Sequence, residues 1–332
     1  MPAIERSDLQ QAIEADLQAV VRQADGPGLA ELHSMLRYHL GWEGEGAGPR
    51  ATGKRVRPLL VLLACDAAGG DWQAALPAAS GVELLHNFSL IHDDIQDNSA
   101  TRRGRPTLWA RWGEAQAINA GDALFALAHL ALQRLDAEAY AQAAQLLPQT
   151  SLQLTQGQYM DLAYETRTDL QLKDYWPMVR GKTAVLMGAC ARLGALVAGA
   201  GDSALTAYSQ FGIQLGLAFQ AHDDILGAWG DEAETGKSAH SDLLSGKKSL
   251  PVLYGLEHSA DFKQRWDAGV SNEAQASELA AVLQDAGARD YAESQVQRLT
   301  SEALEALAQT GVGEEASTEL RALAQELVGR SW

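Results

Sequence analysis

The chain of 332 residues is acidic, with a formal net charge of -17 at pH 7. This charge argues against binding to nucleic acid or to an anionic membrane surface, because the summed field repels polyanions. Hydrophobic residues make up 46% of the sequence and aromatic residues only 6%, and the many Ala and Leu favour an all-α fold. No stretch is typical of a linker, so we expect one large domain spanning residues 1–332.

The cysteines and the N-terminus indicate where the protein works. Cys65 and Cys190 each lie in an apolar helical pattern, which is typical of small buried side chains and suits a reducing cytoplasm. Residues 1–10 are polar and charged where a signal peptide has an apolar core, and every long apolar run contains a charge. We therefore expect a cytoplasmic protein without stable membrane insertion.

Apolar residues at helical spacing predict a helix from Ser7 that carries Leu9, Ile13 and Leu17, followed by a Gly-rich break over residues 41–53. Further helices are predicted over residues 56–68, 77–97, 115–135, 137–147, 150–165, 170–179, 182–200, 202–229, 248–258, 272–286 and 289–328. Two long charged loops, residues 98–112 and 230–247, separate some of them. Function often concentrates in such loops.

Three aspartates stand at the end of the helix predicted over residues 77–97, namely Asp93, Asp94 and Asp97. Asp93 and Asp97 are four residues apart, so they share one face of the helix. Like charges repel there, and the helix dipole disfavours anions at its C-terminus. A bound cation relieves both conflicts, and carboxylates with phosphate and water suit magnesium (Mg2+). The alternative is an acidic surface exposed to water.

A second acidic pair, Asp223 and Asp224, comes late in a long apolar segment, with Asp231 in the loop that follows. One acidic pair alone is a weak signal. Two clusters on facing helices could hold metal ions around a diphosphate.

Cations accompany both clusters. Lys54, Arg55 and Arg57 open a predicted helix, where free N–H groups and the helix dipole favour phosphate. Arg102 and Arg103 follow the first acidic cluster, and guanidinium groups match phosphate oxygens in a bidentate manner. Three further cations each follow a glycine at the edge of a predicted element: Lys182, Lys237 and Lys247.

These motifs, in this order between about Gly53 and Pro251, resemble the trans-isoprenyl diphosphate synthases. The resemblance implies a bundle of many helices around a central cavity, usually homodimeric, with two aspartate-rich motifs at its mouth. It implies Mg2+ as the cofactor, and isopentenyl diphosphate and an allylic diphosphate as substrates. The expected product is a short-chain trans-prenyl diphosphate. Geranylgeranyl diphosphate is the first candidate, and farnesyl diphosphate is the second.

The resemblance also implies roles for individual residues. The magnesium ligands are Asp93, Asp97 and Asp223. The diphosphate of isopentenyl diphosphate is held by Lys54, Arg57, His86 and Arg103. The allylic diphosphate faces Arg102, Lys182 and Lys237, and these cations act in catalysis with the three metal ligands. Polar atoms at the reaction centre come from Gln158, Thr183 and Gln220, with Asp161 close to the metals and Lys247 as a further lysine of the second loop.

The second motif departs from the family pattern at Gly227, where the family usually has a third aspartate. Asp231 is a candidate substitute. We expect Asp223 to bind metal nonetheless, and Gly227→Asp to be tolerated or mildly beneficial.

Product length is expected to depend on Phe88, five residues before Asp93, whose ring lies about 7.5 Å further along the helix. Similar synthases often set length with aromatic residues four or five positions before the first aspartate. Here the fourth is Ser89, and one blocking ring favours geranylgeranyl diphosphate. The alternative is that Phe88 only packs in the core.

Two other functions fit less well. A class I terpene cyclase on the same fold would lack the cations for isopentenyl diphosphate, yet Lys54, Arg57 and His86 are present. A non-catalytic partner subunit would lack an intact first motif, yet Asp93 and Asp97 are both kept.

Overall fold

The structure is a computed structural model that describes residues 5–230 and 240–329. These residues form helices and one short two-stranded ribbon, which confirms the all-α prediction. The chain divides into two compact units. The first unit comprises Met1–Ser151, Ala189–Tyr208 and Val312–Leu320, and the second comprises Leu152–Gly188, Ser209–Gly311 and Arg321–Trp332. The expected single domain remains a prediction.

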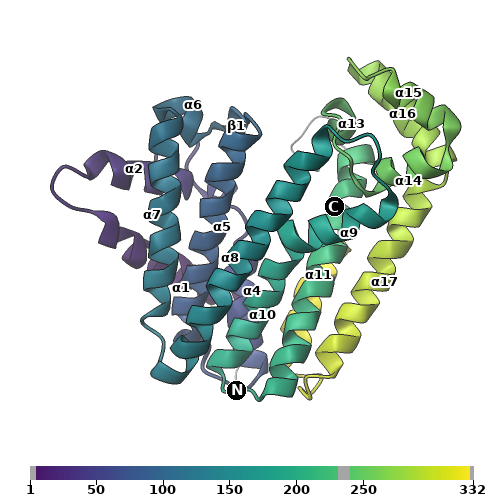
Figure 1. The fold of residues 1–332 in the computed structure, drawn as a ribbon. Coiled ribbons are helices and arrows are strands. Elements are labelled where there is room, and N and C mark those ends of the chain that lie inside the picture. Colours follow the sequence, from purple (N-terminus) through teal and green to yellow (C-terminus); the bar gives the residue numbers. More distant parts are fainter. Residues whose placement is uncertain (1–4, 231–239, 330–332) are drawn as a thin grey trace. The chain divides into compact units, whose positions relative to one another are not determined.

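The first unit contains the N-terminal helices and the first acidic motif (Figure 1). Its elements are α1 (Arg6–Val21), η1 (Arg22–Ala24), α2 (Ala30–His39), α3 (Pro49–Thr52), α4 (Val56–Ala67), η2 (Trp72–Ala75), α5 (Leu76–Gln96), β1 (Thr101–Arg102), β2 (Arg105–Pro106), α6 (Leu108–Trp112) and α7 (Glu114–Leu132). Helices α5 and α7 pack side by side. Gly81 permits their close approach, because a Cβ there would lie 3.1 Å from the carbonyl oxygen of Ala128.

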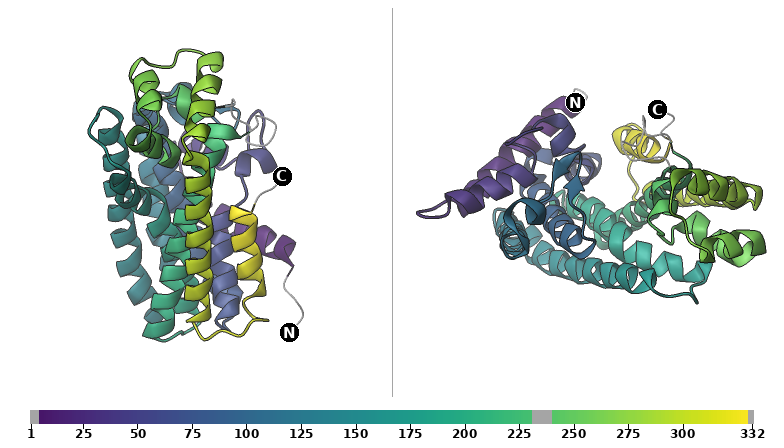
Figure 2. Two further views of the ribbon diagram at one scale, coloured as in Figure 1. Left: turned by 90° about the vertical axis from the view of Figure 1, so that its right-hand side faces the viewer. Right: turned by 90° about the horizontal axis from the view of Figure 1, so that it is seen from above.

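The second unit contains most of the C-terminal half of the chain. Helices α8 (Ala137–Glu165), α10 (Val185–Val197), α11 (Asp202–Trp229) and α18 (Thr318–Val328) contribute residues to both units. The other elements of the second unit are α9 (Leu172–Val179), η3 (Arg180–Ala184), α13 (Ser241–Leu244), α14 (Leu250–His258), α15 (Ala260–Asp267), α16 (Glu273–Asp285) and α17 (Ala288–Ala308). Figure 2 shows α17 as a long yellow-green helix with α15 and α16 near one end.

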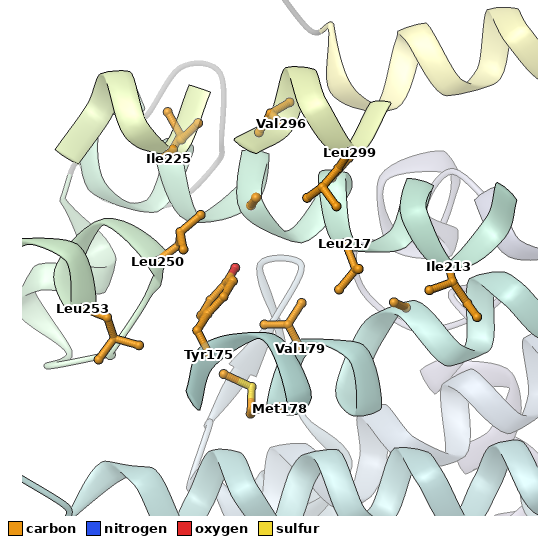
Figure 3. Packing of buried hydrophobic residues seen from close by; sticks show 14 residues of the cluster. Tyr175, Met178, Val179, Ile213, Leu217, Ile225, Leu250, Leu253, Val296 and Leu299 are labelled. Carbon is orange, nitrogen blue, oxygen red and sulfur yellow. The ribbon is translucent and has the colours of Figure 1, made fainter. Parts of the chain in front are cut away.

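The core of the second unit draws side chains from α9, α11, α14 and α17, including Tyr175, Leu217, Leu250 and Leu299. Figure 3 shows the Tyr175 ring standing among these apolar residues, with its hydroxyl pointing away from Met178. Burying such side chains stabilises the unit by about 1.5 to 3 kcal/mol each. The hydroxyl of Tyr175 needs a partner in this core, and that partner is an acidic residue of the site.

Several predicted boundaries are wrong. The two helices predicted over residues 137–147 and 150–165 are one helix, α8, with Pro148 inside it. The pattern over residues 289–328 is broken between α17 and α18, and the short helices α2 and α15 were missed. Within the described residues, no helix combines the length and hydropathy needed to cross a bilayer.

Candidate active site

The first acidic cluster lies at the C-terminal end of α5. Asp94 is only 2% exposed, and its carboxylate accepts a hydrogen bond of 2.8 Å from Nε of Arg102. Burial raises the pKa of Asp94 to about 6, although Arg102 opposes this shift. Asp93 is partly exposed, with its Oδ2 4.0 Å from Nη2 of Arg102, and Asp97 is exposed. The cluster therefore has one buried anchor and two carboxylates that reach water.

A hairpin positions the arginines after this cluster. In the ribbon, Arg102 pairs with Arg105, and the turn residues Arg103 (φ 53°) and Gly104 (φ 74°) have the left-handed conformation of a tight hairpin turn. Arg105 is buried and donates to the carbonyls of three residues near α2, namely Tyr38, Glu43 and Glu45. The segment predicted as one loop over residues 98–112 is thus an anchored ribbon followed by α6.

The predicted cations gather beside this hairpin. Nη1 of Arg103 donates a 2.7 Å hydrogen bond to the carbonyl of Ala51. Gly53 has a φ of 73°, which favours glycine, and a Cβ there would lie 2.8 Å from Cζ of Arg103. Burial lowers the pKa of His86 well below its usual value, and the charges of Arg57, Arg103 and Arg102 lower it further. The first unit therefore brings a neutral imidazole and several arginines together.

The three cations at the start of α4 do not share one role. Lys54 is exposed. Arg55 is buried, and its guanidinium donates to Glu14 at 2.6 Å, to Glu83 at 2.8 Å and to the carbonyl of Leu40 at 3.0 Å. The expectation that all three cations bind phosphate is therefore wrong for Arg55, which holds α4 to the core.

A cavity of about 30 Å³ adjoins the cluster, and its lining includes His39, Asn87, Asp94, Arg102 and Arg103. Burial lowers the pKa of His39 to about 3, with Arg102 and Arg103 contributing. Sequence reasoning missed His39, because no spacing along the chain connects it with a residue on α5.

The second acidic cluster lies near the end of α11 and is held more tightly. Asp224 is 1% exposed. Its Oδ2 accepts hydrogen bonds from the Tyr175 hydroxyl at 2.8 Å and the Leu250 N–H at 3.0 Å. Its Oδ1 accepts from Nε2 of Gln220 and Nζ of Lys247, each at 3.0 Å. Asp224 is thus a structural anchor, and its half-buried neighbour Asp223 is the candidate ligand.

Lys182 and Thr183 lie in η3, a π-helical turn of the kind often found at functional sites. A Cβ at Gly157 would lie 2.1 Å from the backbone nitrogen of Lys182, so glycine is required where α8 meets this turn. One helical turn later, Asp161 accepts a 2.5 Å hydrogen bond from Nζ of Lys182. The Thr183 hydroxyl donates to Oε1 of Gln220 at 3.0 Å. The second unit therefore brings Lys182 together with Asp161, and Thr183 together with Gln220.

A sequence profile of the polyprenyl synthetase family matches residues 48–286. The chain belongs to the polyprenyl synthetase family. It is 41% identical over 309 residues to the (2E,6E)-farnesyl diphosphate synthase of Mycobacterium tuberculosis (strain ATCC 25618 / H37Rv). The match covers 90% of this chain and 86% of that protein. This membership confirms the resemblance seen in the sequence, and the chain is a trans-prenyltransferase of isoprenoid biosynthesis.

Solved structures agree with the fold of this polyprenyl synthetase. The polyprenyl synthetase from Streptomyces coelicolor A3(2) matches with a TM-score of 0.90 and 34% identity, covering 97% of this chain and 98% of that chain. The geranylgeranyl pyrophosphate synthase from Corynebacterium glutamicum, complexed with isoprenyl diphosphate and magnesium, matches with a TM-score of 0.82 and 28% identity. That match covers 98% of this chain and 97% of the other.

Gly227, in the second motif of this polyprenyl synthetase, lies against a carboxylate of another helix. A Cβ at Gly227 would lie 2.4 Å from Cγ and from Oδ2 of Asp242 on α13. An aspartate at position 227 would have to displace the buried carboxylate of Asp242, so the tolerance of Gly227→Asp stays a prediction. Sequence reasoning missed Asp242, although it stands five residues before Lys247 in the second charged loop.

The remaining predicted positions of this polyprenyl synthetase are placed as follows. Gln158 is half-buried on α8. Asp231 and Lys237 lie outside the described residues. The Phe88 ring is half-buried against Phe125 on α7, with centroids 5.0 Å apart, and Ser89 donates to the carbonyl of His86. These contacts fit both the floor and the packing interpretation of Phe88.

Proposed function

We propose that this chain is a magnesium-dependent synthase that condenses isopentenyl diphosphate with an allylic diphosphate to give geranylgeranyl diphosphate. The observation that carries the proposal is the convergence of Arg57, His86, Arg102 and Arg103 next to the first acidic cluster. Such a group of donors suits a diphosphate. It also argues against a cyclase, which has no second diphosphate to bind.

Asp93, Asp97 and Asp223 would hold the metal. Within the described ranges, no three His, Cys, Asp or Glu side chains are arranged to hold a metal ion by themselves. Magnesium fits this donor set, because it is commonly bound by one or two carboxylates together with phosphate oxygens and water. When bound, it supplies positive charge that stabilises the leaving diphosphate.

The chain's own residues would bind and orient the two substrates. Lys54, Arg57, His86 and Arg103 would hold isopentenyl diphosphate, and the neutral imidazole of His86 can donate a hydrogen bond or accept one. Arg102, Lys182 and Lys237 would hold the allylic diphosphate, with Gln158, Thr183, Gln220 and Lys247 completing the polar lining. Anchoring by Asp94 and Asp161 would keep Arg102 and Lys182 aimed before substrate arrives.

We further propose that the enzyme works as a cytoplasmic homodimer. Ile118 and Leu130 on α7 are 44% and 42% exposed and would supply apolar surface for a second copy. Light scattering on purified protein tests this assembly directly, and a monomeric mass would reject it.

The function is tested by incubating the enzyme with labelled isopentenyl diphosphate, magnesium and dimethylallyl, geranyl or farnesyl diphosphate, and sizing the products. We expect geranylgeranyl diphosphate from each primer. Products that stop at farnesyl diphosphate would correct the length, whereas cyclic hydrocarbons without use of isopentenyl diphosphate would show a cyclase. Lys54→Ala and Arg57→Ala should raise the KM for isopentenyl diphosphate far more than that for the allylic substrate.

Product length is tested separately with Phe88→Ala. If the ring is the floor of the product cavity, the mean product grows by at least one isoprene unit. Phe125→Ala is the matched control, because it removes the ring that packs on Phe88. An unchanged product with a lower unfolding temperature would show that Phe88 only packs in the core.

A further inference from the structure

Arg55, the residue that precedes α4, has a backbone conformation that favours glycine. Its φ of 48° and ψ of 41° lie in the left-handed region, which is unfavourable for a long side chain. Such a conformation persists only where the surrounding structure holds it. Lys54 immediately precedes Arg55, and Arg57 follows two residues later. The backbone of Arg55 therefore sets the directions from which these two proposed ligands of isopentenyl diphosphate extend.

The buried side chain of Arg55 makes the contacts that hold this conformation. Its Nε donates to Oε1 of Glu14 at 2.6 Å, and its Nη2 donates to the carbonyl of Leu40 at 3.0 Å. Its Nη1 donates to Oε1 of Glu83 on α5 at 2.8 Å. The side chains of Arg55 and Glu83 are only 3% and 4% exposed. The planar guanidinium fork makes all three contacts at once, which a lysine ammonium does not reproduce.

Glu83 connects this conformation to the helix that carries His86. The oxygen of Glu83 that accepts from Arg55 also accepts from Nδ2 of Asn87 at 2.9 Å. His86 stands three residues after Glu83, so the two lie close together on the surface of α5. Burial lowers the pKa of Arg103, and the charge of Glu83 opposes this shift. One buried carboxylate thus interacts with both elements that supply the proposed ligands of isopentenyl diphosphate and with the arginine after them.

The stability that a buried ion pair adds is small, because the loss of hydration cancels most of the attraction between the charges. Apolar residues of similar volume often stabilise a core equally well or better. An ion pair with hydrogen bonds supplies a fixed separation and orientation instead. The geometry of the Arg55–Glu83 pair therefore explains its presence better than its contribution to stability does.

We propose that the buried Arg55–Glu83 ion pair positions the ligands of isopentenyl diphosphate by fixing the start of α4 against α5. Both are positioning residues. On α4 they act through Lys54 and Arg57, and on α5 they act through His86. The allylic diphosphate faces a different set of cations, so the pair affects one of the two substrates. This inference rests on the proposed function, where the ligands of isopentenyl diphosphate are assigned.

The first test replaces the pair with apolar residues of similar volume, in the double variant Arg55→Met with Glu83→Leu. We expect the KM for isopentenyl diphosphate to rise about tenfold, because a small displacement of a positioned group is costly. The KM for the allylic substrate and the midpoint of urea unfolding should stay close to those of the wild type. A wild-type KM for isopentenyl diphosphate would overturn the proposal.

The double variant leaves the other members of the network with partners. Glu14 is 28% exposed and keeps Nε1 of Trp42 as a donor. Asn87 keeps its hydrogen bond to the backbone carbonyl of residue 83. The variant therefore tests the position of the ligands with few unpaired polar groups left behind.

Glu83→Gln is the second variant, and it decides the question if the double variant does not fold. It keeps the size of the side chain and one acceptor oxygen, but it removes the charge that strengthens the hydrogen bond from Arg55. We expect a several-fold rise in the KM for isopentenyl diphosphate and little change in that for the allylic substrate. Equal rises for the two substrates, or no rise, would show that the ion pair is only structural.

The matched control is Asp16→Asn, which weakens a different polar contact with α5. Asp16 accepts hydrogen bonds from Ser80 on α5 and from Arg134, and it is not among the proposed ligands. Both KM values should stay at the wild-type level. A rise for isopentenyl diphosphate as large as that of Glu83→Gln would overturn the proposal, since any loosening of α5 would then suffice. Failure of the proposed function is distinguishable, because the wild type would then not consume isopentenyl diphosphate.

Discussion

The two aspartate pairs, Asp93 with Asp94 and Asp223 with Asp224, follow one plan but are held differently. In each pair the second aspartate is buried and the first is partly exposed. The buried member fixes the helix end, which leaves its neighbour at a defined place. The anchored aspartate thereby positions its neighbour, the proposed metal ligand, and leaves the carboxylate oxygens of that neighbour available for metal.

The difference lies in the partners. Asp94 accepts from Arg102, whose side chain is 31% exposed and which is itself a proposed substrate ligand. Asp224 accepts from the buried Tyr175 hydroxyl and from the N–H of Leu250 in the hydrophobic core. The first anchor therefore belongs to the site, and the second also belongs to the core. Substitutions at the two positions should separate activity from stability.

The largest effect is expected for Asp224→Ala, which leaves the buried donors Tyr175 and Leu250 without this acceptor. Breaking a buried charged hydrogen-bond network of this kind typically costs about 3 to 5 kcal/mol. Urea unfolding measures the loss, with Asp223→Ala as the control that should lose activity and keep its stability. Equal stability of the two variants would show that Asp224 is not a structural anchor.

A smaller loss is expected for Asp94→Ala, because Arg102 can turn to water when its partner is gone. We expect about 1 kcal/mol, close to the net value of one hydrogen bond. Activity should fall much more, since Arg102 loses its orientation, and KM for the allylic substrate should rise. A loss of stability as large as that of Asp224→Ala would show that both anchors are core residues.

A separate effect concerns acid stability, which should be governed in part by the first unit. The pKa of His39 is lowered from 6.5 to about 3 in the folded state, chiefly by burial. The unfolded chain therefore binds the proton more readily, so the stabilising effect of a neutral His39 is complete above pH 6.5 and is lost as the pH falls towards 3. Urea unfolding of His39→Gln between pH 7 and 4 should show a shallower fall than the wild type.

The control for this experiment is His33→Gln, which removes an imidazole from the same helix. Its fall in stability between pH 7 and 4 is compared with those of the wild type and of His39→Gln. If the free energy of unfolding falls equally with pH in all three proteins, protonation of His39 does not destabilise the folded state.

Local sequence patterns determined most of the helices, since the apolar spacing of α1, α5 and α11 reflects a 3.6-residue period that any core-facing helix must have. They also revealed both aspartate pairs and the family, because those residues are neighbours along the chain. The short helix α2 and the hairpin over residues 101–106 were missed, since their stability comes from distant partners such as Arg105 with the carbonyl of Tyr38.

The tertiary structure alone decided which residues meet from distant parts of the sequence. Arg55, which the sequence offered as a phosphate ligand, forms ion pairs with Glu14 and Glu83 instead. Asp242 lies against Gly227 although the two residues belong to different helices. A spacing rule describes one helix face or one strand, whereas these contacts depend on how separate helices pack. Their positions follow from packing and from the pairing of buried charges, and no pattern within a single segment contains either.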